Sequence, residues 1–106
     1  MYLIREVFNC KPGKVRPMVE KFQAMSKLNV KLGMPKMRIM TDFCAAQYWT
    51  IVAEMEVSDL AAFEKMMAPP APGSVEAADM KQFEEIMKGY HDLIDHGKRE
   101  IYKIEG

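Results

Sequence analysis

The chain has 106 residues, which suffices for one compact domain, residues 1–106, and is too short for two separate cores. Fifteen Lys and Arg balance fifteen Asp and Glu, so no charge excess favours nucleic acid or an anionic membrane as a partner. No apolar run approaches the roughly 20 residues that span a bilayer. The N-terminal residues lack a basic region followed by a long apolar segment, as a signal peptide would have. We therefore expect a soluble, cytoplasmic protein without nucleic-acid or membrane partners.

The N-terminal third predicts a strand followed by a helix. Residues 2–9 alternate with two mainly apolar faces, which indicates a strand that is covered on both sides. A turn at residues 11–14 leads into an amphipathic helix from Val15 to about Leu32. Pro17 is tolerated because it falls in the first turn, and Gly33 supplies the left-handed residue beyond the helix end.

Residues 37–43 and 48–57 predict a hairpin, and the second strand is the centre of the fold. Its two faces alternate strictly. One face carries Trp49, Ile51, Ala53, Met55 and Val57, and the other carries Tyr48, Thr50, Val52, Glu54 and Glu56. We expect Arg5 of the first strand to form an ion pair with Glu54 or Glu56.

The C-terminal half predicts two helices and a strand. Ser58 is expected to cap a short helix over residues 60–67, and Ser74 a long helix that continues to Gly97. The apolar face of the long helix is formed by Met80, Phe83, Met87, Tyr90 and Ile94. Residues 98–105 form the last strand. The proline-rich loop Pro69–Gly73 is interpreted as a surface excursion, with a recognition ligand or a lid as alternatives.

This order predicts an α+β, ferredoxin-like βαββαβ sandwich, in which a four-stranded antiparallel sheet carries the helices on one face. The other face would stay uncovered although it is partly apolar. The strands carry apolar residues on both faces: Tyr2, Ile4 and Phe8 oppose Leu3 and Val7, Ile39 opposes Met37 and Met40, and Val52 opposes Ile51. An uncovered apolar face favours a partner, so we expect a homodimer through the open sheet face.

Five short motifs punctuate the chain: Tyr-Leu-Ile-Arg-Glu, Lys-Pro-Gly-Lys, Gly-Met-Pro-Lys, Tyr-Trp and Arg-Glu-Ile-Tyr. With them the sequence resembles the small NIPSNAP-like proteins of the dimeric α/β barrel superfamily, over nearly its whole length. These motifs mark the starts and ends of secondary-structure elements, and none of them is a catalytic signature. The resemblance implies the dimeric α/β barrel and a small, largely apolar pocket between the helices and the sheet of each subunit.

The first functional hypothesis is that this pocket binds a small hydrophobic molecule without any cofactor. The expected lining comprises Phe22, Trp49, Phe83, Met87 and Tyr90. A purely structural role is another hypothesis, and it predicts that Met and Phe side chains fill the space between the helices and the sheet.

The alternative is an enzyme, and the sequence leaves open whether the protein is one. A cofactor-independent monooxygenase or isomerase of the antibiotic-biosynthesis type would use His91, Tyr48 and Asn9 as catalytic residues. A haem-degrading monooxygenase would resemble this chain at Asn9, Trp49 and His91, with the histidine on iron. Each residue also has an ordinary explanation: a core or interface anchor for Trp49, a partly exposed side chain for His91, and a local hydrogen bond for Asn9.

The remaining polar residues predict no further chemistry. His96 would be a cation at the end of the long helix, where it favours the helix dipole. Cys10 and Cys44 lack metal-ligand spacing and are interpreted as free thiols, although their redox state cannot be deduced from the sequence. No zinc signature, phosphate-binding loop or nucleophile elbow occurs, so no metal is expected.

Overall fold

The computed structural model describes residues 1–68 and 72–106, so residues 69–71 of the predicted Pro69–Gly73 excursion lie outside the described part. The elements follow in the order β1 (Tyr2–Cys10), α1 (Val15–Lys31), β2 (Arg38–Thr41), β3 (Thr50–Val57), α2 (Leu60–Met67), α3 (Val75–Met87), the 3₁₀ helix η1 (Tyr90–Asp92) and β4 (Ile94–Lys103). The strands form one antiparallel sheet in the order β2-β3-β1-β4. The predicted α+β, ferredoxin-like fold is confirmed.

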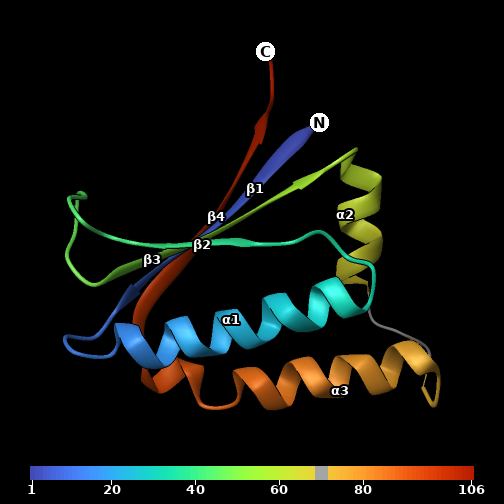
Figure 1. Cartoon of the computed structure of the whole chain (residues 1–106), viewed down its shortest axis with the longest axis horizontal. Coiled ribbons are helices and arrows are strands. Elements are labelled where there is room, and N and C mark those ends of the chain that lie inside the picture. Colours follow the sequence, from blue (N-terminus) through green and yellow to red (C-terminus); the bar gives the residue numbers. More distant parts are fainter. Residues whose placement is uncertain (69–71) are drawn as a thin grey trace.

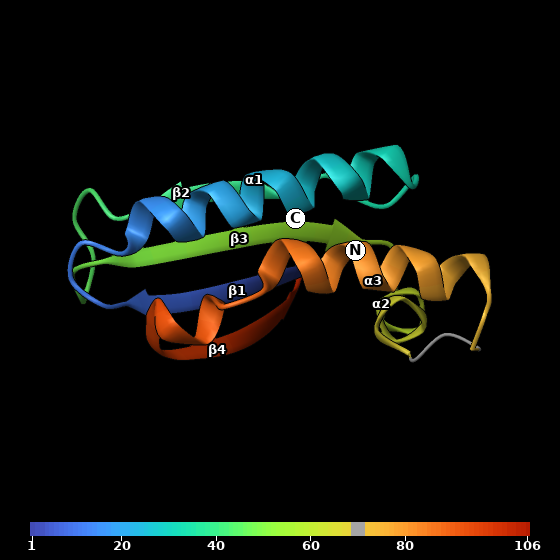
Figure 2. The same ribbon diagram turned by 90° about the horizontal axis from the view of Figure 1, so that it is seen from below.

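The helices α1 and α3 lie side by side on one face of the sheet, while α2 stands at its end (Figures 1 and 2). The core forms between these layers. Its buried residues include Met18, Val19 and Phe22 of α1 and Ile51 and Ala53 of β3. The opposite face of the sheet carries no helix among the described residues, and we call it the open face (Figure 1).

Local sequence signals explain the helix starts. In α1, Pro17 lies in the first turn, and Gly33 beyond the helix end has a φ of 75°, both as predicted. Ser74 caps α3 as predicted, because its hydroxyl accepts the Ala77 N–H at 3.1 Å. The predicted cap of α2 was wrong by one residue: the Asp59 carboxylate, not Ser58, accepts the Ala62 N–H, at 2.7 Å.

The predicted long helix to Gly97 was wrong. The helix α3 ends at Met87 because Gly89 adopts the left-handed region with a φ of 81°. Lys21 of α1 stabilises this end, since its Nζ donates to the carbonyl oxygens of Ile86 and Lys88, at 3.2 and 2.7 Å. The chain then turns through η1 and enters β4 at Ile94, four residues earlier than predicted.

The strand boundaries near the hairpin also differ from the prediction. β2 covers only Arg38–Thr41, and β3 begins at Thr50, so Tyr48 and Trp49 belong to the connecting loop. Met37 precedes β2 and is buried in the core cluster against which Ile39 also packs, so the prediction that Met37 and Ile39 lie on opposite faces was wrong. The alternation of β3 is as predicted, with Ile51 in the core. Within the described residues, no helix is both long and apolar enough to cross a membrane.

Candidate functional site

A row of charged side chains crosses the open face from strand to strand. The register places Arg5 of β1 between Glu54 of β3 and Glu100 of β4. Arg5 Nε donates to Glu54 Oε2 at 2.8 Å, and Arg5 Nη1 donates to Glu100 Oε1 at 2.9 Å. The predicted pairing of Arg5 with Glu54 is therefore confirmed.

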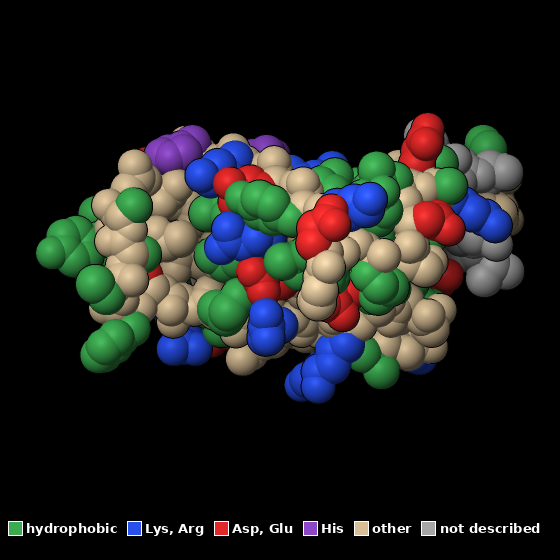
Figure 3. Space-filling model, turned by 90° about the horizontal axis from the view of Figure 1, so that it is seen from above, with side chains coloured by type: hydrophobic (Ala, Val, Ile, Leu, Met, Phe, Trp, Pro, Cys, Tyr) green, Lys and Arg blue, Asp and Glu red, His purple; other side chains and the backbone are tan. Residues whose placement is uncertain are grey.

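The row continues to both edges of the sheet. Arg38 of β2 donates from Nη2 to Glu54 Oε1 at 2.7 Å. On β4, the Tyr102 hydroxyl donates to Glu100 Oε2 at 3.1 Å, and Lys98 Nζ lies 3.8 Å from the same oxygen. We call Arg38, Glu54, Arg5, Glu100 and Lys98 the charged ladder. Figure 3 shows this alternation of basic and acidic side chains, with hydrophobic side chains between them.

Glu54 is the most enclosed carboxylate of the ladder, with a side chain only 10 % exposed. The hydrogen bond from Arg38 is the main cause that lowers its pKa; burial opposes this effect, and the bond from Arg5 adds to it. A carboxylate that is held ionised, with both oxygens occupied, is a weak proton acceptor. The ladder therefore organises the face and offers no general base at Glu54.

The loop between β2 and β3, residues 42–49, shapes the neighbouring surface. Trp49 has a φ of 61° and is the one non-glycine residue with positive φ in the described part of the chain. Its carbonyl oxygen accepts the Cys10 N–H at 2.8 Å. The next residue, Thr50, donates its N–H to Asp42 Oδ1 and its hydroxyl to the Gln47 carbonyl, both at 2.8 Å. These bonds hold the loop and fix the backbone at Trp49.

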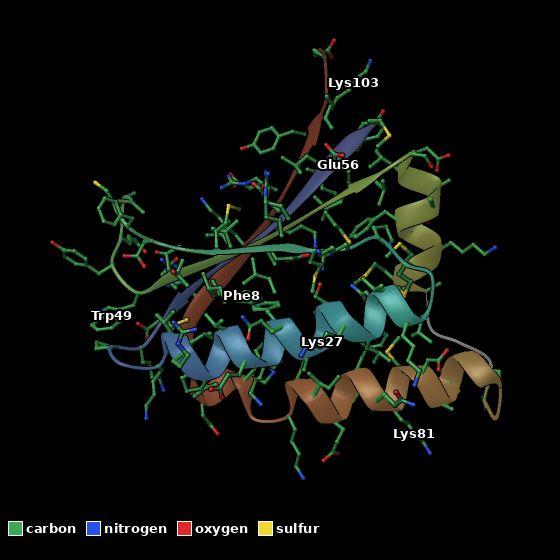
Figure 4. All side chains as sticks on the ribbon, in the orientation of Figure 1. Phe8, Lys27, Trp49, Glu56, Lys81 and Lys103 are labelled. Atoms are coloured by element: carbon green, nitrogen blue, oxygen red, sulfur yellow. The ribbon has the colours of Figure 1, made fainter. Side chains whose placement is uncertain are left out.

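Trp49 borders a hollow of about 510 Å³ beside the start of α1. Its lining consists of Val15, Thr41, Asp42, Tyr48 and Trp49, and we call it the Trp49 hollow. Trp49 is 43 % exposed and Tyr48 is 85 % exposed, so both rings are available to a ligand. Figure 4 shows Trp49 at the loop end of the sheet, whereas Phe8 points from the sheet toward α1.

A second hollow, of about 320 Å³, lies on the open face near the same loop. Val7, Asn9, Thr50, Val52, His96 and Lys98 are among its lining residues, and we call it the open-face hollow. Asn9 Nδ2 donates to Thr50 Oγ1 at 3.1 Å across the two strands. The two hollows share no lining residue.

The structure separates the three residues that were expected to be catalytic. Asn9 lies on the open face, and Tyr48 lies in the loop at the Trp49 hollow. His91 lies in η1 and is exposed, and its ring centroid lies 3.9 Å from that of Tyr90, with the two ring planes tilted by 34°. Tyr90 contacts Phe8 on the helix side of the sheet, at 6.3 Å between ring centroids. Asn9 and His91 therefore lie on opposite sides of the sheet.

Of the five expected ligand-binding residues, three lie at one core cluster, whereas Phe83 and Trp49 lie outside it. Phe22 is 2 % exposed, and Met87 and Tyr90 pack against the same cluster. Phe22 also contacts Phe8, at 5.6 Å between ring centroids, so side chains occupy this part of the space between helix and sheet. Phe83 is half-buried on α3.

The described residues do not fit the haem arrangement. Asn9 and His91 lie on opposite sides of the sheet, and Trp49 lies in the loop, so the three cannot surround one haem. No group of three or more His, Cys, Asp or Glu side chains is placed to hold a metal ion within the described residues.

The two cysteines lie in different environments. Both are free; Cys44 is exposed and Cys10 is buried. Burial raises the pKa of the Cys10 thiol, and the carboxylates of Asp42 and Asp95 add to this effect. Cys10 is therefore a core residue.

Several residues of these sites were missed from the sequence. Arg38, Glu100 and Lys98 belong to the charged ladder, and His96 lines the open-face hollow. The alternation of Lys98 and Glu100 with their neighbours was the available signal. Lys98 and Glu100 lay in the predicted last strand, but the register of that strand against β1 was not predicted. His96 was missed because residues up to Gly97 were assigned to a helix.

Comparisons with known proteins place the fold. Neither a protein-family model nor a curated protein sequence matches this chain. A NIPSNAP domain protein from Burkholderia xenovorans, itself uncharacterised, superposes with a TM-score of 0.67 at 14% identity, over 99% of this chain and 95% of that one. A dimeric protein of unknown function from Bacteroides fragilis, with a ferredoxin-like fold, gives 0.64 at 14% identity, over 97% and 96%.

A third solved structure carries the name of an activity. It is a protein from Deinococcus radiodurans provisionally named an antibiotic biosynthesis monooxygenase, with a TM-score of 0.62 at 11% identity, over 100% of this chain and 94% of that one. At these identities the likeness concerns the fold. The chain thus has the ferredoxin-like fold found in NIPSNAP domain proteins and in proteins of the antibiotic biosynthesis monooxygenase type.

Proposed function

We propose that the protein is a homodimer that binds a small, largely hydrophobic molecule in the Trp49 hollow of each subunit. The observation that supports this function is the conformation of Trp49. A bulky residue in the left-handed region costs about 1–3 kcal/mol, and such strain concentrates at functional sites. Here the strain holds a half-exposed indole against a hollow.

The lining of the Trp49 hollow suits a small molecule with one polar end. Val15, Tyr48 and Trp49 offer apolar and aromatic surface, and Asp42 offers a carboxylate. Asp42 Oδ1 accepts the Thr50 N–H, which fixes the orientation of this carboxylate. The volume of about 510 Å³ lies within the usual range for small-molecule sites, about 300–1,000 Å³. An apolar molecule that carries a hydroxyl group would match both parts.

The homodimer rests on the composition of the open face. Apolar side chains at Leu3, Val7 and Val52 alternate there with the charged ladder. Arg5, Glu54 and Glu100 find their partners within the subunit, so a second copy could cover the face without leaving these ions unpaired. The dimeric neighbour with the same fold supports this arrangement.

A second candidate is a cofactor-independent monooxygenase or isomerase at the same hollow. It is favoured by the presence of the Asp42 carboxylate and the Tyr48 phenol in one lining, because such chemistry needs a base and a proton donor. Turnover of a bound ligand would distinguish this candidate from simple binding.

The single tryptophan of the chain is the natural reporter for the test. Titration with 6-bromohexanol, whose bromine quenches indole fluorescence on contact, should give saturable quenching in the wild type. Val15→Asp should abolish the saturable part, because it introduces a charge into the hollow. An acidic residue in the first turn suits the helix dipole, but Val15 also packs against the core cluster, so the circular dichroism spectrum of the variant is compared with that of the wild type.

The matched control is Ala24→Asp, which adds the same charge at an exposed position of the same helix. 6-Bromohexanol should quench the fluorescence of this variant as saturably as that of the wild type. Quenching that rises linearly, as with bromide ion, or that persists in Val15→Asp would contradict binding in the Trp49 hollow.

A further inference from the structure

We propose that the open-face hollow is a second ligand site, separate from the Trp49 hollow, and that it takes an organic monocarboxylate. Its floor is apolar. Val7 of β1 is 8 % exposed and lies opposite Val52 of β3, and both line the hollow. An alkyl chain lying across these two side chains would remove apolar surface from water.

The charged ladder places an excess cation at this hollow. Its members carry three positive charges, on Arg38, Arg5 and Lys98, and two negative charges, on Glu54 and Glu100. Both carboxylates are held by arginines at hydrogen-bond distance. Lys98 is the remaining cation. Its Nζ lies 3.8 Å from Glu100 Oε2, and its side chain is 62 % exposed, so it can turn to a ligand.

Other donors stand beside Lys98. Asn9 uses one amide hydrogen for Thr50 Oγ1, which leaves the second for a ligand, and Asn9 pairs with His96 of β4. Lys98 pairs with Val7, which is the neighbouring pair on the open face along the same two strands. A carboxylate held by Lys98 and Asn9 therefore lies directly above the apolar floor. A single anionic head joined to an apolar chain matches this order of groups.

This site does not depend on the ligand proposed for the Trp49 hollow, because the two hollows have different linings. A second subunit packed on the open face would cover the hollow and exclude water from it. The state of assembly is measured separately, by sedimentation.

The test is a titration of ¹⁵N-labelled protein with hexanoate, followed by two-dimensional NMR. Hexanoate should shift the amide signals of Val7, Asn9, Thr50 and Lys98 saturably, whereas hexanol and inorganic phosphate should not. Lys98→Met should weaken hexanoate binding about tenfold or more, as the loss of one charge-assisted hydrogen bond does. Lys103→Met, which removes an exposed lysine from the end of the same strand, should change it less than about twofold.

The spectra of both variants report folding directly, so a failed fold cannot be mistaken for lost binding. If hexanol shifted these four amide signals as tightly as hexanoate does, the charge would have no part in binding and the proposal would be overturned. Shifts confined to Val15 and Trp49, unchanged binding by Lys98→Met, or equal saturable shifts with phosphate would overturn it as well.

Discussion

At the scale of single residues, Glu54 shows how position decides the role of a side chain. It is an acidic residue of a central strand, which by itself is compatible with a catalytic base. In the structure Arg38 and Arg5 each donate to one of its oxygens, and their bonds lower its pKa. The residue therefore contributes to stability through its charge.

This role predicts a defined pH dependence. Because the pKa of folded Glu54 lies below that of the unfolded chain, its contribution is present above the ordinary glutamate pKa. It is lost as the pH falls below about 4.3 toward the folded value. At pH 7, Glu54→Gln should lower the free energy of unfolding by about 1.5–3 kcal/mol, the usual worth of hydrogen bonds to a charged group. The difference from wild type should shrink in acid.

Denaturant unfolding at several pH values measures this effect. Glu56→Gln is the control, because Glu56 is exposed on the same strand and outside the charged ladder, and it should change stability by less than about 0.5 kcal/mol. An equal loss at pH 7 and in acid would mean that Glu54 acts through its shape instead of its charge.

At the scale of elements, the C-terminal third shows one apolar pattern shared by three elements. Met87, Tyr90, Leu93 and Ile94 all pack against the core, although they belong to α3, η1, the following turn and β4. The helical spacing of these residues therefore predicted their burial correctly, but it wrongly predicted one continuous helix. The early start of β4 lets Gly97 pair with Phe8 of β1.

Gly97 is required there by close packing. A Cβ atom at Gly97 would lie 2.5 Å from Phe8 Cδ1, so the ring would have to move. Gly97→Ala should destabilise the protein by about 1–3 kcal/mol, as overpacking does, although the same change at an open site would be neutral or stabilising.

A double-mutant cycle in denaturant isolates this contact. In a Phe8→Ala background, which removes the ring, Gly97→Ala should cost markedly less than in the wild type. An equal cost in both backgrounds would show that the penalty comes from the backbone at Gly97.

At the scale of the whole molecule, the open face is the main feature that requires an explanation. One face of the sheet is covered by α1 and α3, and the other exposes a ladder of paired charges with apolar residues between them (Figures 1 and 3). The paired charges make the face compatible with burial, and the apolar side chains favour it.

Val52→Lys should therefore convert the proposed homodimer to a monomer that keeps its fold, because the added cation would be unpaired in the interface. Val30→Lys makes the same change at a position of α1 that is 55 % exposed, and it should remain dimeric. Sedimentation equilibrium measures both. A monomeric wild type, or a dimeric Val52→Lys variant, would contradict the assembly through the open face.

The order of the elements, the two faces of β3 and the pairing of Arg5 with Glu54 were predictable from the sequence. They depend on local periodicity and on the few topologies that connect such elements. The register of β4, the end of α3 and the place of Trp49 outside the strand were not. Each depends on contacts between distant residues. Asn9 pairs with His96 in the register of β4, Lys21 of α1 bonds the carbonyls at the end of α3, and Cys10 bonds the Trp49 carbonyl.

The candidate sites follow the same division. The sequence by itself determined that Asn9, Tyr48, Trp49 and His91 were present, with a fold that leaves one sheet face open. Only the tertiary structure decided which of them meet: Tyr48 and Trp49 at one hollow, Asn9 with His96 and Lys98 at another, and His91 on the opposite side of the sheet from Asn9. The physical reason is that residue spacing sets the face of one element, whereas a site forms where the faces of several elements converge.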